Sequence, residues 1–270
     1  MLLKHDRGQI DYLSFGPENA SSLVIVAHAA ATGAQAYTRF GQLLVLNECQ
    51  VVVPNLCGYG KTQLEYLETS FSVQDHVSVL EALLDQSKAE NVHLIGHSMG
   101  GLVAYKFAAM RTVSSLTLIE PMIFSVLDPL EDYEAIKLDR DLVEAFHDHF
   151  DQGKAEEGIR IFIEAWNGVK WDDMNPSLRQ RIIELTPQLY QESKAVTFDQ
   201  QTSQDLSPAC PILLMQGEDT LLPAKAIIRR LRGKFPEADF QCIKGEGHMG
   251  PLFNSPAFTA IISKFQSDKS

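Results

Sequence analysis

The sequence predicts an α/β domain whose mostly parallel central sheet carries helices on both faces and a helical insertion. One observation is an alternation of short apolar runs with longer segments of helical period, which is typical of parallel strands joined by helices. The other is a break in this alternation between residues 122 and 202, where apolar side chains keep helical spacing. We therefore expect residues 1–121 and 203–270 to form the sheet core and residues 122–202 to form a helical cap.

The predicted strands are short apolar runs. Residues 9–15 alternate apolar and polar side chains, so we expect an edge strand there. The other runs are continuous and rich in Val, Ile and Leu, as expected for parallel strands that are covered on both faces. These predicted buried strands are residues 22–27, 50–54, 92–95, 115–121 and 211–217, and a further strand without this continuous pattern is predicted over residues 239–243.

The predicted helices separate these strands. Residues 72–86 repeat apolar side chains at a helical period, and they are the clearest case. Further core helices are predicted over residues 37–46, from residue 102, over residues 224–234 and after Pro256. In the insertion, apolar spacing predicts helices around residues 142–150, 159–166 and 178–183, with Pro129, Pro176 and Pro187 expected to punctuate them.

Composition and charge indicate a soluble globular protein. The 270 residues are 45% hydrophobic and 21% charged, which suffices for a large core. The formal net charge of −12 argues against a nucleic-acid or anionic-membrane partner, because the long-range field repels polyanions. We expect a small-molecule substrate and a chain that is a monomer or a homodimer.

Cysteine usage and the termini point to the cytoplasm. The four cysteines lie far apart in the sequence and lack metal-binding spacing, so we expect reduced thiols, no disulfide and no metal. The N-terminus lacks the charged and then apolar pattern of a secretion signal. The apolar runs are too short to span a bilayer, so we expect a cytoplasmic protein without a membrane partner.

The most distinctive stretch is a predicted strand, turn and helix around Ser98. The turn reads Gly96-His97-Ser98-Met99-Gly100, with a buried strand before it and an apolar-faced helix after it. Small residues on both sides of Ser98 suit a turn so sharp that the serine is strained and its hydroxyl projects outward. The stretch resembles the nucleophile elbow of the α/β-hydrolase superfamily. That resemblance covers almost the whole chain and implies an α/β-hydrolase fold with Ser98 as nucleophile, whereas His97 is expected only to pack.

A serine nucleophile needs a histidine base, and the base needs an acid. His248 follows the last predicted strand in Gly245-Glu-Gly-His248-Met-Gly-Pro, which resembles the loop that carries the catalytic base in this superfamily. Two acids fit the chain order of serine, acid and histidine. Asp219 is favoured because its loop resembles the one that usually supplies the acid, although it lies one residue closer to the preceding glycine than is usual. Glu120, at the end of another predicted strand, is the alternative.

The oxyanion hole requires two backbone N–H groups. Met99, the first residue after the nucleophile, is expected to supply one of them. The run His28-Ala29-Ala30 resembles the family's His-Gly-x loop, with Ala29 where glycine is usual, so Ala30 is the expected second donor. Residues 55–62 resemble another turn of the family, and we interpret that turn as structural.

These residues predict a hydrolase that needs no cofactor and no metal. The leading function is cleavage of a carboxylic ester of a small apolar acyl or aryl substrate through an acyl-enzyme. A C–C bond hydrolase, a thioesterase or a lactonase would use the same triad. A non-catalytic ligand-binding receptor is a third class, against which the intact Ser, acid and His set argues. Large aromatic residues in the cap are expected to form its core and to line an apolar pocket; they are Phe124, Phe146, Phe150, Phe162, Trp166, Trp171 and Phe198.

Overall fold

A computed structural model describes most of the chain, and its strands form one sheet. The described residues are 1–18, 20–45, 49–68, 70–199 and 207–269. The strands within them are β1 (Leu2–His5), β2 (Gly8–Phe15), β3 (Ser22–Ala27), β4 (Gln50–Pro54), β5 (Gln63–Leu64), β6 (Asn91–His97), β7 (Ser115–Ile119), β8 (Ile212–Gly217) and β9 (Asp239–Ile243). They lie in the order β1-β2-β4-β3-β6-β7-β8-β9, and β5 pairs with β2.

The strand pairing confirms a mostly parallel sheet. Strands β4, β3, β6, β7, β8 and β9 are parallel to one another, whereas β2 is antiparallel to β1, β4 and β5. The prediction of an edge strand over residues 9–15 is wrong, because β2 lies between β1 and β4. Its alternating pattern instead reflects the antiparallel part of the sheet, in which one face of a strand commonly stays near solvent.

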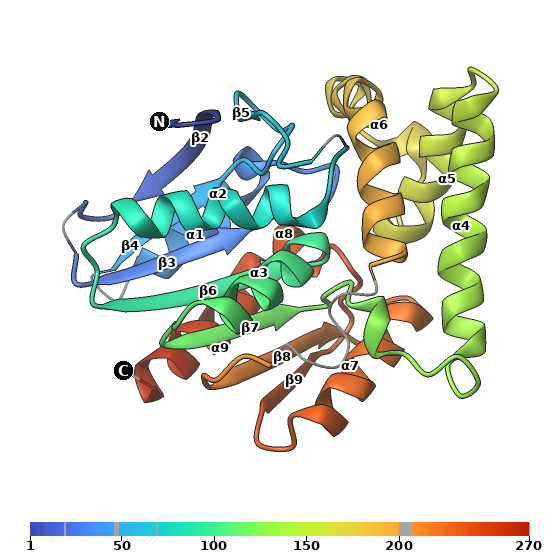
Figure 1. Ribbon diagram of the computed structural model, residues 1–270. Coiled ribbons are helices and arrows are strands. Elements are labelled where there is room, and N and C mark those ends of the chain that lie inside the picture. The colour runs from blue at the N-terminus through green and yellow to red at the C-terminus, as the bar shows by residue number, and fades with distance from the viewer. Residues whose placement is uncertain (19, 46–48, 69, 200–206, 270) are drawn as a thin grey trace.

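Helices cover both faces of this sheet, as Figure 1 shows. The core helices are α1 (Thr38–Leu44), α2 (Val73–Gln86), α3 (Met99–Met110), α7 (Leu222–Lys234), α8 (Gly250–Phe253) and α9 (Ser255–Asp268). On one face α1 and α9 pack against the strands, and on the other face α2, α3 and α7 do so. The predicted end of the first helix, at residue 46, lies outside the described residues. In the part of the chain described here, no helix combines the length and the apolar character that a membrane crossing requires.

Three helices between β7 and β8 form the predicted helical insertion. They are α4 (Tyr133–Asp151), α5 (Ala155–Asn167) and α6 (Pro176–Thr197). They stand together beyond one end of the sheet, on the right in Figure 1. Their apolar faces pack into a second, smaller core with Phe146, Ile159, Ile163 and Ile182, which Trp171 between α5 and α6 and Ala31 from the loop after β3 complete. The predicted end of the cap, at residues 202 and 203, lies outside the described residues.

Pro187 does not separate two helices, contrary to the sequence prediction, because it lies inside α6. A proline within a helix removes the backbone hydrogen bond to the carbonyl four residues earlier, here that of Ile183. Burial of Ile182 and Leu189 on either side of the proline offsets that loss. The helix therefore continues past the proline as far as Thr197.

Candidate active site

Ser98 lies at the sharp turn between β6 and α3. Its backbone has φ 56° and ψ −121°, a conformation that a non-glycine residue adopts only under strain. A Cβ atom on Gly96 would lie 2.3 Å from the carbonyl oxygen of Gly100, and one on Gly100 would lie 2.2 Å from that of Ala27. Because no side chain fits at either position, the two glycines allow the close approach that the turn requires.

His248 joins Ser98 to a carboxylate. It follows β9, and its Nε2 atom lies 3.0 Å from the hydroxyl oxygen of Ser98. On the other side of the ring, Nδ1 lies 2.6 Å from Oε2 of Glu120. An ionised carboxylate only accepts hydrogen bonds, so Nδ1 carries the proton and Nε2 is free to accept one from the serine. A hydroxyl in this arrangement is activated for nucleophilic attack.

Glu120 follows β7 directly and is only 1% exposed. Its carboxylate also accepts hydrogen bonds from the backbone N–H of Gly217, at 2.7 Å, and from the hydroxyl of Thr220, at 2.5 Å. Burial alone would raise the pKa of Glu120, but the hydrogen bond from His248, the positive charge of that ring whenever it is protonated, and the hydrogen bonds from Thr220 and Gly217 outweigh burial and lower the pKa. Glu120 is therefore held as a carboxylate facing His248.

Asp219, the acid that the sequence favours, is not the carboxylate at His248. Its side chain is exposed, and its backbone N–H donates to the carbonyl of Glu246 at 2.9 Å. The neighbouring Thr220 is the residue of this loop that turns inward, toward Glu120. Because β7 and β8 are parallel neighbours, either strand end could have reached the histidine. Glu120, the alternative acid, and not Asp219 is therefore the carboxylate that contacts Nδ1 of His248.

The two predicted oxyanion donors line the same cavity as Ser98 and His248. Met99 is the first residue of α3, where a backbone N–H has no partner within the helix. On the loop after β3, the N–H groups of Ala29 and Ala31 donate to the hydroxyls of Tyr37 and Tyr59, each at 3.1 Å. Among the described residues, the N–H groups of Met99 and Ala30 have no hydrogen-bond acceptor. Both are therefore available to a ligand, and their role as donors remains a prediction.

His97 does more than pack, which the sequence did not reveal. The carbonyl oxygen of His248 accepts a hydrogen bond from Nε2 of His97 at 2.8 Å, and the Tyr37 hydroxyl donates to Nδ1 at 2.6 Å. Burial lowers the pKa of His97 to about 3, so the ring is neutral and can donate a hydrogen bond from Nε2 while it accepts one at Nδ1. Because Tyr37 also accepts from the N–H of Ala29, a continuous hydrogen-bonded path connects the two loops on either side of Ser98.

The cavity above Ser98 has a volume of about 60 Å³ and lies between the sheet and the cap. The indole of Trp166, on α5, lies against the imidazole of His248 with ring centroids 4.7 Å apart. The remaining apolar lining comes from both parts of the fold and includes Met122, Phe124, Val143, Phe162, Ile163 and Leu189. Polar cap residues also line it, among them Asp139, Glu192 and Thr197. Within the described residues, no group of three or more His, Cys, Asp or Glu side chains could hold a metal ion.

Asp139→Asn is expected to stabilise the protein increasingly as pH rises from 4 to 8. Asp139 is 3% exposed, its carboxylate accepts a hydrogen bond from Thr197 at 2.9 Å, and burial raises its pKa from 3.8 to about 7. In this pH range the unfolded chain loses the proton before the native state does, so stability falls until pH passes 7. We expect a gain of about 1–3 kcal/mol at pH 8, measured by urea unfolding.

The exposed Asp141, on the same helix, provides a matched control for this measurement. It pairs with Lys137 near solvent, so Asp141→Asn should change stability by less than about 1 kcal/mol at any pH in the range. A stability difference between Asp139→Asn and wild type that stays constant from pH 4 to 8 would contradict the prediction, because the titration of Asp139 would then not contribute.

Comparison with known proteins shows the family of the chain. A sequence model described as the alpha/beta hydrolase fold matches residues 22–159. A Bacillus subtilis protein, provisionally named as a 2-succinyl-6-hydroxy-2,4-cyclohexadiene-1-carboxylate synthase, is 30% identical over 156 residues, or 57% of this chain and 53% of its own length. The chain therefore spans only about half the length of that relative. Lipase LipV of Mycobacterium tuberculosis is 25% identical over 265 residues, which cover 92% of this chain and 94% of the lipase.

Solved structures show the same fold. The structure of MenH from S. aureus superposes with a TM-score of 0.71 at 18% identity, and the match covers 96% of this chain and 98% of that one. Such low identity carries information on the fold alone. The family match spans just over half of the 270 residues and includes the turn that bears Ser98. The chain therefore belongs to the alpha/beta hydrolase fold family.

Proposed function

We propose that the protein is a serine hydrolase that cleaves a carboxylic ester of a small apolar acyl or aryl substrate through an acyl-enzyme. The observation that carries this proposal is the hydrogen-bonded chain from Ser98 through His248 to Glu120, with distances of 3.0 and 2.6 Å. It lies in a cavity that the backbone N–H groups of Met99 and Ala30 also line, and neither group has an acceptor in the part of the chain that the structure describes. This combination of nucleophile, base, acid and oxyanion donors is what acyl transfer requires.

In the first half of the reaction, the oxygen of Ser98 attacks the ester carbonyl while its proton passes to Nε2 of His248. Glu120 stabilises the resulting imidazolium, and the N–H groups of Met99 and Ala30 stabilise the negative oxygen of the tetrahedral intermediate. The intermediate collapses when His248 gives its proton to the leaving alcohol. The acyl group is then bound to Ser98.

In the second half, water replaces the alcohol. His248 takes a proton from the water as the water oxygen attacks the acyl carbonyl, and the same N–H groups hold the second tetrahedral intermediate. His248 then returns the proton to Ser98, and the carboxylic acid departs. No cofactor is needed at any step, because the imidazole performs every proton transfer.

The cavity supports a small apolar substrate. Its volume of about 60 Å³ is small beside the ~300–1,000 Å³ of typical ligand pockets. Aromatic and aliphatic side chains from the cap and the core form most of its lining, which favours a short acyl chain or a single ring over a charged group. The resemblance to a lipase over nearly the full length agrees with ester chemistry.

A C–C bond hydrolase is the second candidate, because it would use the same triad and because the Bacillus subtilis relative is named as the synthase of a cyclohexadiene carboxylate and not as an esterase. A thioesterase and a lactonase would use the same residues. The candidates differ in the leaving group to which His248 delivers its proton, an alcohol oxygen for an ester and a carbon for a C–C bond. Substrate panels therefore separate them, whereas variants of the triad do not.

The test is hydrolysis of p-nitrophenyl esters with acyl chains from two to twelve carbons, next to thioesters, lactones and an aryl diketone. We expect the highest kcat/KM for the short-chain esters, because the cavity excludes longer chains. An initial burst of nitrophenol equal to the enzyme concentration would reveal the acyl-enzyme wherever deacylation is slow. If the enzyme turned over only the diketone, the proposed function would be C–C bond hydrolysis and not ester hydrolysis. A folded protein without any turnover would favour a receptor.

A further inference from the structure

Glu192 is a buried carboxylate of the cap that the proposed reaction does not use. It lies on α6, is 1% exposed and lines the cavity above Ser98. Its two oxygens accept hydrogen bonds from the hydroxyl of Tyr59 at 2.6 Å, from Nε2 of Gln188 at 2.9 Å and from Nε2 of His76 at 3.1 Å. Burying a carboxylate is costly unless donors surround it in this way. The donors from Tyr59 and His76 belong to the sheet core, so Glu192 ties the cap to the core.

Tyr59 connects Glu192 to the loop after β3, residues 28–31, which holds Ala30 and which we call the oxyanion loop. The same hydroxyl that donates to Glu192 accepts the backbone N–H of Ala31 at 3.1 Å. Burial raises the pKa of Tyr59 well above its ordinary value, and the negative charge of Glu192 adds to this effect, so the hydroxyl keeps the proton that it donates. Donation to a charged acceptor also strengthens the bond that the oxygen accepts. A path of two hydrogen bonds therefore runs from α6 to Ala31.

Ala31 needs such a restraint because its backbone is strained. Its φ of 62° lies in the left-handed region, which costs a non-glycine residue on the order of 1–3 kcal/mol. The peptide groups on both sides of the Ala30 N–H are held by tyrosines, since Tyr37 binds the N–H of Ala29 and Tyr59 that of Ala31. Together they fix the direction of the N–H between them, the one that we expect to face the oxyanion.

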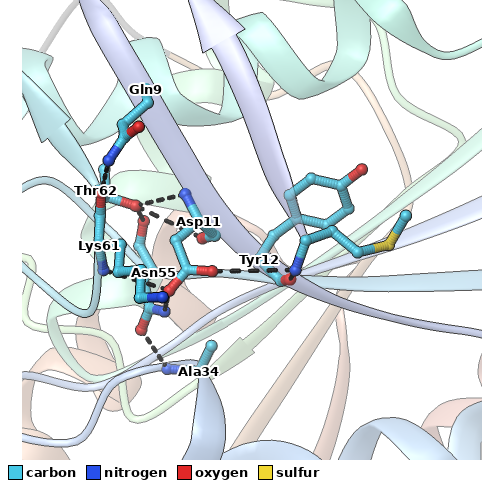
Figure 2. Close-up of polar contacts among 8 residues, drawn as sticks. Gln9, Asp11, Tyr12, Ala34, Asn55, Lys61 and Thr62 are labelled. Atoms are coloured by element: carbon cyan, nitrogen blue, oxygen red, sulfur yellow. Dashed lines mark hydrogen bonds and ion pairs between the residues drawn. The ribbon is translucent and has the colours of Figure 1, made fainter.

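The loop that presents Tyr59 is itself clamped at both ends, as Figure 2 shows. Asn55 donates to a carboxylate oxygen of Asp11 at 2.9 Å and accepts the N–H of Ala34 at 2.8 Å. Thr62 donates to the carbonyl of Asn55 at 2.8 Å and accepts the N–H of Asp11 at 2.9 Å. The loop that holds Tyr59 is therefore restrained at both ends. Because the loop is restrained, the position of the Tyr59 hydroxyl depends mainly on its hydrogen bond to Glu192 on α6.

We propose that Glu192 is a positioning residue for the oxyanion hole, acting through Tyr59, so that docking of cap helix α6 completes the hole. This inference rests on the proposed serine-hydrolase function. Glu192 and Tyr59 need not touch the ester for this role, because they act on the direction of the Ala30 N–H. Their loss should therefore weaken stabilisation of the transition state more than binding of the ground state.

The first test compares Tyr59→Phe with wild type on a short-chain p-nitrophenyl ester. Loss of an oxyanion donor lowers kcat about 10²- to 10³-fold, and a misdirected donor should have a smaller effect of about 10- to 10²-fold. KM should stay within about twofold, because ground-state contacts are unchanged. Tyr66→Phe is the matched control. Tyr66 packs against Phe71, and its hydroxyl has no hydrogen-bond partner among the described residues, so kcat should not change.

The second test uses a trifluoromethyl ketone, whose adduct with Ser98 places an oxyanion in the hole. Its affinity should fall in Tyr59→Phe and Glu192→Leu by the same factor as kcat/KM, whereas the affinity for the product alcohol should not change. Glu192→Gln, which keeps an acceptor for Tyr59, should recover most of the loss. A general folding defect would instead lower the affinities for the trifluoromethyl ketone and for the product alcohol by similar factors. Tyr59→Phe tests the bond to Ala31 and Glu192→Leu tests the bond from the cap, so the proposal also fails if a folded Glu192→Leu keeps kcat within twofold of wild type. If Glu192→Leu does not fold, Glu192→Ala takes its place under the same criterion.

The proposal is overturned if Tyr59→Phe keeps kcat and trifluoromethyl ketone affinity within twofold of wild type. It is also overturned if the variant raises KM and leaves kcat unchanged, because Tyr59 would then contribute to substrate binding. A folded wild type that neither reacts with a fluorophosphonate nor hydrolyses an ester would overturn the proposed function, and this inference with it. Failure of the proposed function would be seen with the wild type alone, whereas failure of the Glu192 proposal would be seen only in the variants, so the two failures can be told apart.

Discussion

Glu120→Gln is expected to lower kcat for ester hydrolysis about 10²- to 10⁴-fold with little change in KM. The carboxylate of Glu120 holds Nδ1 of His248 at 2.6 Å and therefore fixes the tautomer in which Nε2 can accept the proton of Ser98. A glutamine can donate its own N–H to Nδ1, which selects the wrong tautomer, and it carries no charge to stabilise the imidazolium. Steady-state kinetics on a short-chain p-nitrophenyl ester measure the effect.

Asp219→Asn is the matched control, because it makes the same chemical change in the residue next to Thr220. Its side chain is exposed, so kcat should remain within about twofold of wild type. The assignment of the acid would be wrong if the two results were exchanged, with Asp219→Asn losing activity and Glu120→Gln keeping it. Unfolding curves of both variants show whether a loss of activity reflects a loss of fold.

Ser98→Ala should lower kcat still further, by about 10³- to 10⁶-fold. The change removes the atom that forms the acyl-enzyme, so the burst of nitrophenol should vanish together with turnover. The fold should survive, because an alanine side chain is smaller than that of serine and the sharp turn depends on Gly96 and Gly100. Binding of the product alcohol, followed by calorimetry, should stay within about twofold, since the oxyanion loop and the cap are unchanged.

Ser193→Ala provides the control for that experiment. Ser193 lines the same cavity, but its hydroxyl faces the cap, where it bonds to His147 and to the carbonyl of Tyr190. We expect its kcat to stay within about tenfold of wild type. Retention of most of the activity by Ser98→Ala would mean that another nucleophile, or water activated directly by His248, performs the reaction.

The sequence was a good guide where structure is local and periodic. Continuous apolar runs identified the central strands, and β9 was placed to the residue because Asp239–Ile243 is bounded by turn residues. The short strands β1 and β5 were missed, since four and two residues carry too little pattern to be recognised. Pro187 predicts a helix break when only neighbouring residues are considered, because proline has a low helix propensity, whereas in the folded protein packing on both sides of the proline keeps α6 continuous.

The site was predictable to the extent that its residues sit in short motifs. Ser98 and His248 each lie in a glycine-rich turn after a strand, so their neighbours in sequence point to them. The acid required three-dimensional information, because the ends of β7 and β8 are adjacent and a single residue decides which carboxylate turns inward. The contact between Tyr59 and Glu192 could not be found at all, since the two residues are 133 positions apart and no motif links them.

Labelling by a fluorophosphonate, followed by mapping of the modified peptide, tests the assignment of Ser98, His248 and Glu120 most directly. The reagent needs an activated serine but no particular leaving group, so it does not depend on knowing the natural substrate. We expect one adduct in the folded wild type, on Ser98, no adduct in Ser98→Ala, and labelling slowed about 10²-fold or more in Glu120→Gln but not in Asp219→Asn. A folded wild type that stays unlabelled, or an adduct on a different residue, would contradict the assignment.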